Sequence, residues 1–565
     1  MTSQYRVHQG FLSVGDTDLM VHVHQQPSPA PTVVISSAFG LSCTEPRYLM
    51  TLLARRLADG GANVVQYDQP GAGDSTGDSR TLSSADLFRA GCRVLDYSAG
   101  MSSGRIALVG YGVGNAVVSW LMEHHDLDAA VLIAPCMRAW GRDWTRLCGP
   151  GSDGFVAPQV TPDDSELGDV WRALYGEPVV PSQPPGPIGS RLFVDLAALR
   201  PYQTICSRHD DVLVISDIAA DLDGATSVLL AHKGDSTEPS WHWGIGPRGQ
   251  VVEGVADWVE RTRPGPFNDL SASTCSRTHA TGIVRLRTDT SGSKSSTMAI
   301  RVHGDVMFGV LRRPAVSSPL PGLCVVYETG NPGQRVDIHG CGPVIAERLA
   351  GHGLASFRYD PRGMGLSTGR FQDMTWSRRV EDLSAVIEAL KAEHFESIVV
   401  LGNSAGARVG LRGAALERCI VGLVLWGPIL RETVIEGPPP KVLRVDGGVA
   451  TEWCGLPLGL RYQRDVRDHD DIEVLVQSDT PICLVFAEDE PDRLNEQLVL
   501  AAAASRAGVT VCSSPGQHGF SWSGLQEAIE HSLRWIEASV GTRVRHDVRG
   551  PETETGRMHS GRSSR

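Results

Sequence analysis

An internal repeat constrains the fold of this chain more than any other feature of its sequence. The segment QYDQPGAGDSTG at 66–77 aligns with RYDPRGMGLSTG at 358–369, so that Asp68 and Asp360 lie 292 positions apart. The same offset aligns GYGVG at 110–114 with GNSAG at 402–406. An ungapped match over roughly a hundred residues is hard to obtain by chance, and the sequence therefore predicts two copies of one domain.

Both copies show the same order of predicted elements. Short apolar runs such as 32–35 and 323–327 alternate with longer helical patterns such as 48–58 and 344–350. This alternation predicts an α/β fold in which each copy is a doubly wound, mostly parallel sheet with helices on both faces.

Each copy also contains an insertion rich in Pro and Gly, at 136–208 and at 428–478. We expect these insertions to form lids over the carboxyl ends of the strands, where ligands bind in such sheets. The expected organisation is a first domain over 1–264, a linker over 265–297, a second domain over 298–542, and a disordered, arginine-rich tail over 543–565.

The segment GNSAG at 402–406 is the strongest chemical signal. It follows four apolar residues (398–401) that predict a buried strand, and a helical run follows it. Glycines at 402 and 406 allow strand and helix to pack closely around a sharp turn that presents the Ser404 hydroxyl. The sequence thus predicts Ser404 as a nucleophile, with the N–H of Ala405 free at a helix N-terminus to stabilise an oxyanion.

Composition narrows the possible partners. The formal charge of −13 argues against nucleic acid, and no apolar run approaches the ~20 residues of a membrane span. The first residues, MTSQYRVHQGFLSVGD, lack the pattern of a signal peptide, and the twelve cysteines contain no C-x-x-C pair. We therefore expect a cytoplasmic protein with reduced cysteines and no structural zinc.

The combination of YDPRGMGLS at 359–367 with GNSAG at 402–406 resembles the α/β-hydrolase fold superfamily. Within it, the chain is most similar to bacterial serine hydrolases of the esterase, lipase and aminopeptidase-like groups, and to the small hydrolases encoded with exosortase systems. The resemblance covers both halves of the chain. It implies a triad in the chain order Ser, acid, His, a small-molecule acyl substrate, and no metal or organic cofactor.

The resemblance places the triad acid about three residues beyond the small residue that closes a late strand. That strand is predicted at 482–487, and Glu490 occupies the implied position. Asp489 remains an alternative, because the loop at 488–492 contains further carboxylates. The resemblance implies His518, in PGQHGF at 515–520 before the final helix, as the general base.

The second oxyanion donor is expected in the loop ETGNPG at 328–333. Gly330 resembles the glycine of the family's His-Gly motif, although Thr329 replaces the histidine, and the N–H of Asn331 is the candidate donor. Pro332 cannot donate. Asp360 and Arg362 are interpreted as structural residues.

The first copy lacks the chemically distinctive residues. Gly112 stands at the position of Ser404, Ala219 stands opposite Glu490, and Pro70 replaces Arg362. His242 could be a remnant of the base, but it has no hydroxyl to activate. We interpret this copy as a pseudo-hydrolase kept for packing, substrate capture or assembly, and expect the two copies to pack on each other within the chain.

Two classes of function follow. The first is a serine hydrolase that cleaves an ester or thioester through an acyl-enzyme on Ser404, with an acyltransferase using the same triad as a variant. The second is a non-catalytic binding or scaffold protein. A hydrogen bond between His518 and Ser404 distinguishes the first class from the second.

Overall fold

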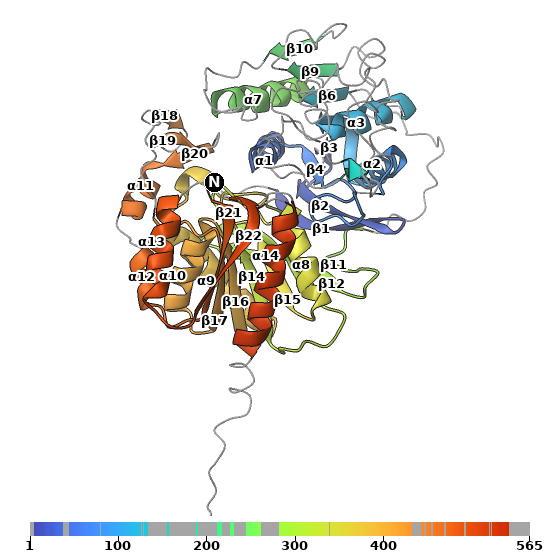
Figure 1. The fold of residues 1–565 in the computed structure, drawn as a ribbon. Helices are drawn as coiled ribbons and strands as arrows, with labels where there is room; N and C mark the ends of the chain where they lie inside the picture. The colour runs from blue at the N-terminus through green and yellow to red at the C-terminus, as the bar shows by residue number, and fades with distance from the viewer. Residues whose placement is uncertain are drawn as a thin grey trace, which may run out of the picture.

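The computed structural model describes residues 5–37, 44–79, 81–125, 127, 129–133, 155–156, 188–189, 212–216, 227–230, 245–261, 282–337, 340–431, 442–445, 448–453, 456–467, 471–490, 493–518, 520 and 522–541. These residues build two sheets that follow each other along the chain, coloured blue to green and yellow to red in Figure 1. Within this part of the chain, no helix has the length and apolar character needed to cross a membrane.

The first sheet has eight strands in the order β1-β2-β4-β3-β5-β6-β9-β10. The hairpin β1–β2 is antiparallel and pairs antiparallel with β4, and the remaining strands are parallel. The strands are β1 (Arg6–Val14), β2 (Thr17–Gln25), β3 (Ala30–Ser36), β4 (Asn63–Tyr67), β5 (Ser102–Tyr111), β6 (Ala129–Ile133), β9 (Val212–Ser216) and β10 (Ser227–Leu230).

Helices cover both faces of this sheet. Helices α2 (Ser84–Ala99) and α3 (Val113–His124) pack into one apolar core, whereas α1 (Thr44–Asp59) and α7 (Ile245–Arg261) pack into another. Runs of β-branched residues such as those in β3 and β4 are buried on both sides, as parallel central strands require.

The second sheet has nine strands in the order β11-β12-β13-β15-β14-β16-β17-β21-β22. Without β11, this order matches the first sheet strand by strand. The strands are β11 (Leu286–Thr288), β12 (Lys294–Val302), β13 (Asp305–Arg313), β14 (Leu323–Glu328), β15 (Ala355–Tyr359), β16 (Ser397–Asn403), β17 (Ile420–Trp426), β21 (Ile482–Asp489) and β22 (Val509–Gln517).

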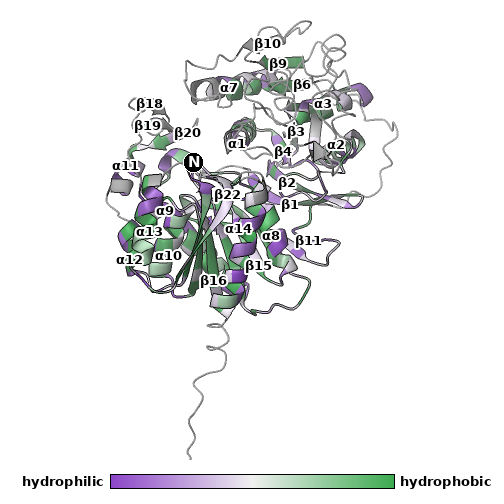
Figure 2. Cartoon of the chain, in the orientation of Figure 1, coloured by the Kyte–Doolittle hydropathy of each residue, from purple (hydrophilic) through white to green (hydrophobic). Residues whose placement is uncertain are grey.

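Alternate strand residues of the second sheet face two separate apolar cores. Val400 packs with α9 (Trp376–Ala392), α10 (Gly406–Leu416) and α13 (Arg493–Ala504), and Val399 packs with α8 (Cys341–Gly351), α14 (Trp522–Trp535) and the adjoining η6 (Ile536–Val540). Figure 2 shows these strands as a mostly hydrophobic layer between helices that carry hydrophilic residues. The predicted fold class, two tandem doubly wound α/β units, is confirmed.

Equivalent contacts recur in the two units. Met20 N donates to Ser75 Oγ at 2.9 Å, and Phe308 N donates to Ser367 Oγ at 2.9 Å. After β4 the Asp68 carboxylate accepts from Asp74 N, at 3.0 Å, and after β15 the Asp360 carboxylate accepts from Leu366 N, at 2.9 Å. The turn that follows each Tyr-Asp pair is therefore folded in the same way.

The expected boundaries differ from the structure in one place. Strand β11 and the beginning of β12 lie within the expected linker, 265–297, and pair with the second sheet. The second unit thus begins before residue 298. The expected tail, 543–565, and most of the first insertion lie outside the described residues.

The second insertion forms a small layer beside the second sheet. It contains the antiparallel strands β18 (Val442–Val445), β19 (Gly448–Trp453) and β20 (Leu456–Gly459), followed by α11 (Leu460–Arg467) and α12 (Asp471–Gln477). The Asp465 carboxylate accepts from Trp376 N at 2.6 Å and so caps α9. Arg408 and Arg412 on α10 both pair with the buried Asp471, which fixes the end of this insertion on the sheet.

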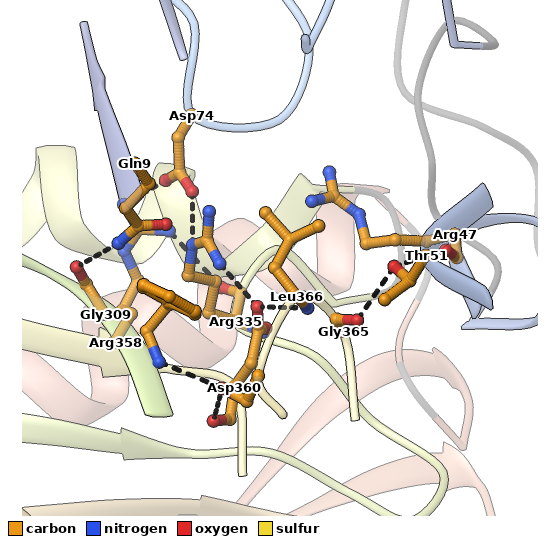
Figure 3. A network of polar contacts seen from close by, with 12 residues as sticks. Gln9, Arg47, Thr51, Asp74, Gly309, Arg335, Arg358, Asp360, Gly365 and Leu366 are labelled. Carbon is orange, nitrogen blue, oxygen red and sulfur yellow. Dashed lines mark hydrogen bonds and ion pairs between the residues drawn. The ribbon is translucent and has the colours of Figure 1, made fainter. Parts of the chain in front are cut away.

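The two units contact each other directly. Gln9 Nε2 donates to Gly309 O at 3.0 Å, and Thr51 Oγ1 on α1 donates to Gly365 O at 3.0 Å (Figure 3). Arg55, also on α1, donates to Gly369 O at 3.1 Å. The contact surface therefore includes the hairpin and α1 of the first unit and the hairpin and the turn after β15 of the second.

Candidate active site

Ser404 lies in the sharp turn between β16 and α10. Its φ of +53° is in the left-handed region, which a serine adopts only under constraint from its surroundings. A Cβ at position 406 would lie 2.3 Å from Glu328 O, and a Cβ at 402 would lie 2.8 Å from Ala407 N. Both positions therefore require glycine, and the turn holds the Ser404 side chain at the carboxyl end of the sheet.

The structure brings Ser404, His518 and Glu490 into one hydrogen-bonded chain. His518 Nε2 lies 3.0 Å from Ser404 Oγ, and His518 Nδ1 lies 2.9 Å from Glu490 Oε1. Glu490 follows β21 directly and is 5% exposed, while His518 follows β22 directly. The four consecutive strands β16, β17, β21 and β22 are parallel, and the three residues follow three of them at their carboxyl ends, which is the usual ligand end of a parallel sheet.

Of the two acids that the sequence allows, only Glu490 contacts the imidazole among the described residues. Asp489 is the last residue of β21 and is exposed, and no hydrogen bond joins it to His518 in the described part of the chain. The second oxygen of Glu490, Oε2, is buried without a partner among these residues. Glu490 is therefore placed to fix the tautomer and orientation of His518.

Gly427 completes the wall behind the imidazole. It directly follows β17 with a φ of +45°, and a Cβ there would lie 3.0 Å from His518 Nδ1 and 3.4 Å from Glu490 Oε2. The lack of a side chain at this position therefore leaves room for the histidine and carboxylate. No sequence motif marks this glycine, because its role depends on the residues that follow neighbouring strands.

Of the two expected oxyanion donors, Ala405 directly follows Ser404, and Asn331 follows Gly330, which lies close to Ser404. Within the described residues, the amides of Ala405 and Asn331 donate no hydrogen bond, so both are available to a ligand. A Cβ on Gly330 would lie 3.4 Å from Ser404 Cβ, which shows how closely this loop approaches the nucleophile. Both side-chain polar atoms of Asn331 are buried without a partner in the same part of the chain.

A buried ion pair contacts the backbone of the loop at 328–333. Arg379 on α9 pairs with Glu328 and donates to Thr329 O at 2.9 Å and to Gly330 O at 3.4 Å. The Tyr359 hydroxyl donates to the other oxygen of Glu328. Burial raises the pKa of the Glu328 carboxyl, and Arg379 opposes that shift. Sequence reasoning missed both residues, because they are 51 positions apart.

Asp360 and Arg362, interpreted from sequence as structural, bind backbone and buried charges. Arg362 pairs with the buried Asp382, and its N donates to the same carboxylate at 3.0 Å. Asp360 accepts from Arg335 N at 2.7 Å. These contacts hold the segment that follows β15. The hydrogen bonds between carboxylate, imidazole and hydroxyl are made by Glu490, His518 and Ser404.

The first unit keeps the shape of the turn without its hydroxyl. Gly112 has a φ of +58°, close to that of Ser404, and a Cβ at position 114 would lie 1.9 Å from Ser36 O, as position 406 does against Glu328 O. Ala219 and His242, the expected counterparts of the acid and base, lie outside the described residues. Among the residues that the structure does describe, no group of three or more His, Cys, Asp or Glu side chains could hold a metal ion.

Solved structures with similar folds include the Butyrivibrio proteoclasticus esterase Est1E with bound ferulic acid, at 21% identity over 43% of this chain and 99% of that chain, with a TM-score of 0.37. They also include DcsB in complex with a substrate analogue, at 19% identity over 43% and 99%, with a TM-score of 0.35. A putative hydrolase from Agrobacterium vitis S4 has 16% identity over 44% and 98%, with a TM-score of 0.33. No curated protein matches the sequence.

Two family models match different regions of the sequence. Residues 33–269 match the model of the alpha/beta hydrolase family, and residues 340–470 match the model described as serine aminopeptidase, S33. The first match falls in the unit built on β1–β10 and the second in the unit that contains Ser404. With its two doubly wound sheets and the turn at 402–406, the chain belongs to the α/β-hydrolase superfamily.

Proposed function

We propose that the second unit is a serine hydrolase that cleaves an ester or thioester bond of a small-molecule acyl substrate, and that the first unit is a pseudo-hydrolase. The observation that carries the proposal is the chain from Glu490 Oε1 through His518 to Ser404 Oγ, with distances of 2.9 and 3.0 Å. These distances lie within the range required of a nucleophile, its base and an orienting acid. They favour an enzyme over a non-catalytic binding protein.

In the proposed acylation step, Ser404 Oγ attacks the acyl carbon while its proton passes to His518 Nε2. Glu490 stabilises the imidazolium through Nδ1–H. The amides of Ala405 and Asn331 bind the oxyanion of the tetrahedral intermediate, and each such donor is worth ~3 kcal/mol. When the intermediate collapses, the bond to the leaving group breaks, and His518 gives its proton to the departing alcohol or thiol.

Deacylation uses the same residues in reverse. Water loses a proton to His518 as its oxygen attacks the acyl-enzyme, and the second tetrahedral intermediate expels Ser404, which recovers a proton from His518. The products are a free acid and the resting enzyme. This cycle consumes only water and needs no cofactor.

The test is labelling of the full chain with a fluorophosphonate probe, followed by mass spectrometry of the adduct. We expect a single adduct on Ser404, none in Ser404→Ala, and slower labelling in His518→Ala, because the hydroxyl loses its base. Absence of an adduct on the folded wild-type protein, or an adduct that persists in Ser404→Ala, contradicts the proposal.

A further inference from the structure

A charged residue of the first unit is buried beside the loop that carries the proposed oxyanion donor of the second. Asp74 Oδ2 lies 2.6 Å from Arg335 Nε, and Asp74 Oδ1 lies 2.8 Å from Arg358 Nη2. Arg335 also pairs with Asp360. Figure 3 shows that Asp74 approaches this group from the first unit, while the other three residues belong to the second.

The four side chains form one buried group of ion pairs, and the charges of Arg287 and Asp68 act on it from nearby. Their exposed fractions are 5% or less, and the group contains two cations and two anions. Burial alone would raise the pKa of the Asp74 carboxyl, but Arg358 and Arg335 outweigh that effect and hold the pKa below its usual range. Without Asp74, Arg358 would lose the carboxylate with which it pairs and Arg335 would keep Asp360, and a buried guanidinium that loses its carboxylate is strongly unfavourable away from water.

Asp74 holds the backbone of Arg335 by two routes. It binds the Arg335 side chain directly, and it binds Arg358, whose Nη1 donates to Arg335 O at 3.2 Å. Arg335 N donates to Asp360 Oδ1 at 2.7 Å. The side chain, amide and carbonyl of Arg335 are therefore all fixed by this group.

Arg335 lies in the segment 329–337 that connects β14 to α8, and the same segment contacts the nucleophile turn at two places. Gly330 packs against Ser404, and the Asp337 carboxylate accepts from Asn403 Nδ2 at 3.2 Å. Asn331, the proposed oxyanion donor, lies four residues before Arg335. A shift of Arg335 would therefore move the segment that sets the distance between the Asn331 amide and Ser404.

The position of Asp74 is charged in the first unit but apolar in the second. By the offset of 292, the counterpart of Asp74 is Leu366, an apolar residue that lies beside His22 and Gln66 of the first unit. At this position the first unit thus supplies a charge to the loop next to Ser404, whereas the second unit presents an apolar side chain to the first. The unit with Ser404 is the one that receives the buried charge.

We propose that the first unit acts as a positioning partner, in which Asp74, through Arg335 and Arg358, holds the 329–337 segment at the geometry that lets the Asn331 amide bind the oxyanion. This inference rests on the proposed function. Asp74 touches neither the substrate nor the reacting atoms, so its removal should slow the chemical step and leave substrate binding intact.

The experiment compares wild type, Asp74→Asn and Gln9→Leu as full chains, with p-nitrophenyl butyrate for kcat and KM, the fluorophosphonate for labelling, and thermal unfolding for stability. Gln9→Leu is the matched control, because it removes a different hydrogen bond between the units, which runs at 3.0 Å to Gly309 O in the β12–β13 hairpin and not to the 329–337 segment. We expect Asp74→Asn to lower kcat by about tenfold or more with an unchanged KM, since small misplacements of a catalytic group are costly. Gln9→Leu should keep the wild-type kcat.

A double variant keeps the test decisive if Asp74→Asn does not fold. Asp74→Asn/Arg358→Met restores the charge balance of the buried group and leaves Arg335 paired with Asp360 alone, so we expect it to fold with a lowered kcat. A wild-type kcat in the folded Asp74 variants, with Ser404 still labelled, overturns this inference and leaves the proposed function standing. An equal loss of kcat in Gln9→Leu also overturns it, whereas an unlabelled wild-type Ser404 removes the proposed function itself.

Discussion

Gln9 and Thr297 occupy the same position of their respective hairpins, and Thr297 Oγ1 donates to Gln9 O at 3.3 Å across the boundary between the units. Two contacts beside them are related in the same way, because one becomes the other when the two units are swapped. The exchanged pairs are Met20 with Val310 and His22 with Phe308. The two hairpins therefore pack about a local pseudo-twofold axis, as the subunits of a symmetric dimer do.

The hydrogen bond from His518 to Glu490 predicts which carboxylate matters for activity. Glu490→Gln should lower kcat by about 10³- to 10⁴-fold, since an amide no longer orients and stabilises the imidazolium. Asp489→Asn is the matched control, because Asp489 is adjacent but exposed, and it should retain the wild-type kcat. Steady-state kinetics with p-nitrophenyl butyrate provide the comparison, and the reverse ranking of the two variants would exclude Glu490 as the acid.

Gly427→Ala should impair the histidine without unfolding the protein. The added methyl group would lie 3.0 Å from His518 Nδ1 and 3.1 Å from its Cε1, so the imidazole must shift. We expect kcat to fall by about tenfold or more. Gly508→Ala is the control for backbone strain, because Gly508 also has a positive φ, +79°, but no atom lies within 4 Å of its Cβ position. Equal kcat values for the two variants would contradict this packing argument.

Two buried histidines at the boundary between the units predict a loss of stability in acid. Burial lowers the pKa of His24 to about 3 and lowers the pKa of His22 well below its usual value. The positive charge of Arg55 adds to both shifts, and that of Arg335 adds to the shift of His22. The unfolded chain protonates its histidines near 6.5. Below that pH the unfolded state therefore binds more protons, and the free energy of unfolding falls as the pH drops toward about 3.

Below about pH 6.5, each of these histidines contributes a slope of up to about 1.4 kcal/mol per pH unit to the free energy of unfolding. Urea unfolding of wild type and of His22→Phe/His24→Phe between pH 7.5 and 4.5 measures the effect. We expect the double variant to have the flatter profile, while the exposed-site variant His124→Gln follows the wild type. Parallel profiles for the double variant and wild type would disprove the assignment.

Introducing a serine hydroxyl into the first unit should not make that unit reactive toward the fluorophosphonate. Gly112 has the backbone of the nucleophile turn, with a φ of +58°, so Gly112→Ser presents a hydroxyl at the right position of the fold. We expect no fluorophosphonate adduct at residue 112 in Gly112→Ser/Ser404→Ala, because serine without a base is a poor nucleophile. An adduct there would reject the pseudo-hydrolase proposal.

Sequence alone predicts the parts of the site that depend on local geometry. The turn at 402–406 is visible because two glycines flank Ser404 at positions where any Cβ would collide with Glu328 or Ala407. The burial of both Val399 and Val400, in cores on opposite faces of the sheet, likewise follows from their place in a continuous apolar run, which is typical of a central parallel strand. Local spacing and hydrophobic pattern are sufficient for these features.

The sequence favours Glu490 but leaves Asp489 as an alternative, because the choice depends on where β21 ends. The strand continues to Asp489, two residues beyond the expected end at 487, and this places Glu490 first in the turn toward His518. The ion pair between Asp74 and Arg335 could not be predicted from the sequence either, because the two residues are 261 positions apart and belong to different units. Contacts of this kind are set by the packing of two complete folds, and no local pattern records them.

The pseudo-twofold packing of the hairpins has a consequence for how the two units can differ. In a dimer of identical chains, every substitution at such an interface appears on both sides of the axis. Here both sides are encoded separately, so Asp74 can be charged while its counterpart Leu366 is apolar. Joining the two units in one chain therefore permits symmetry breaking: one fold can exchange its own reactive residues for contacts that benefit only its neighbour.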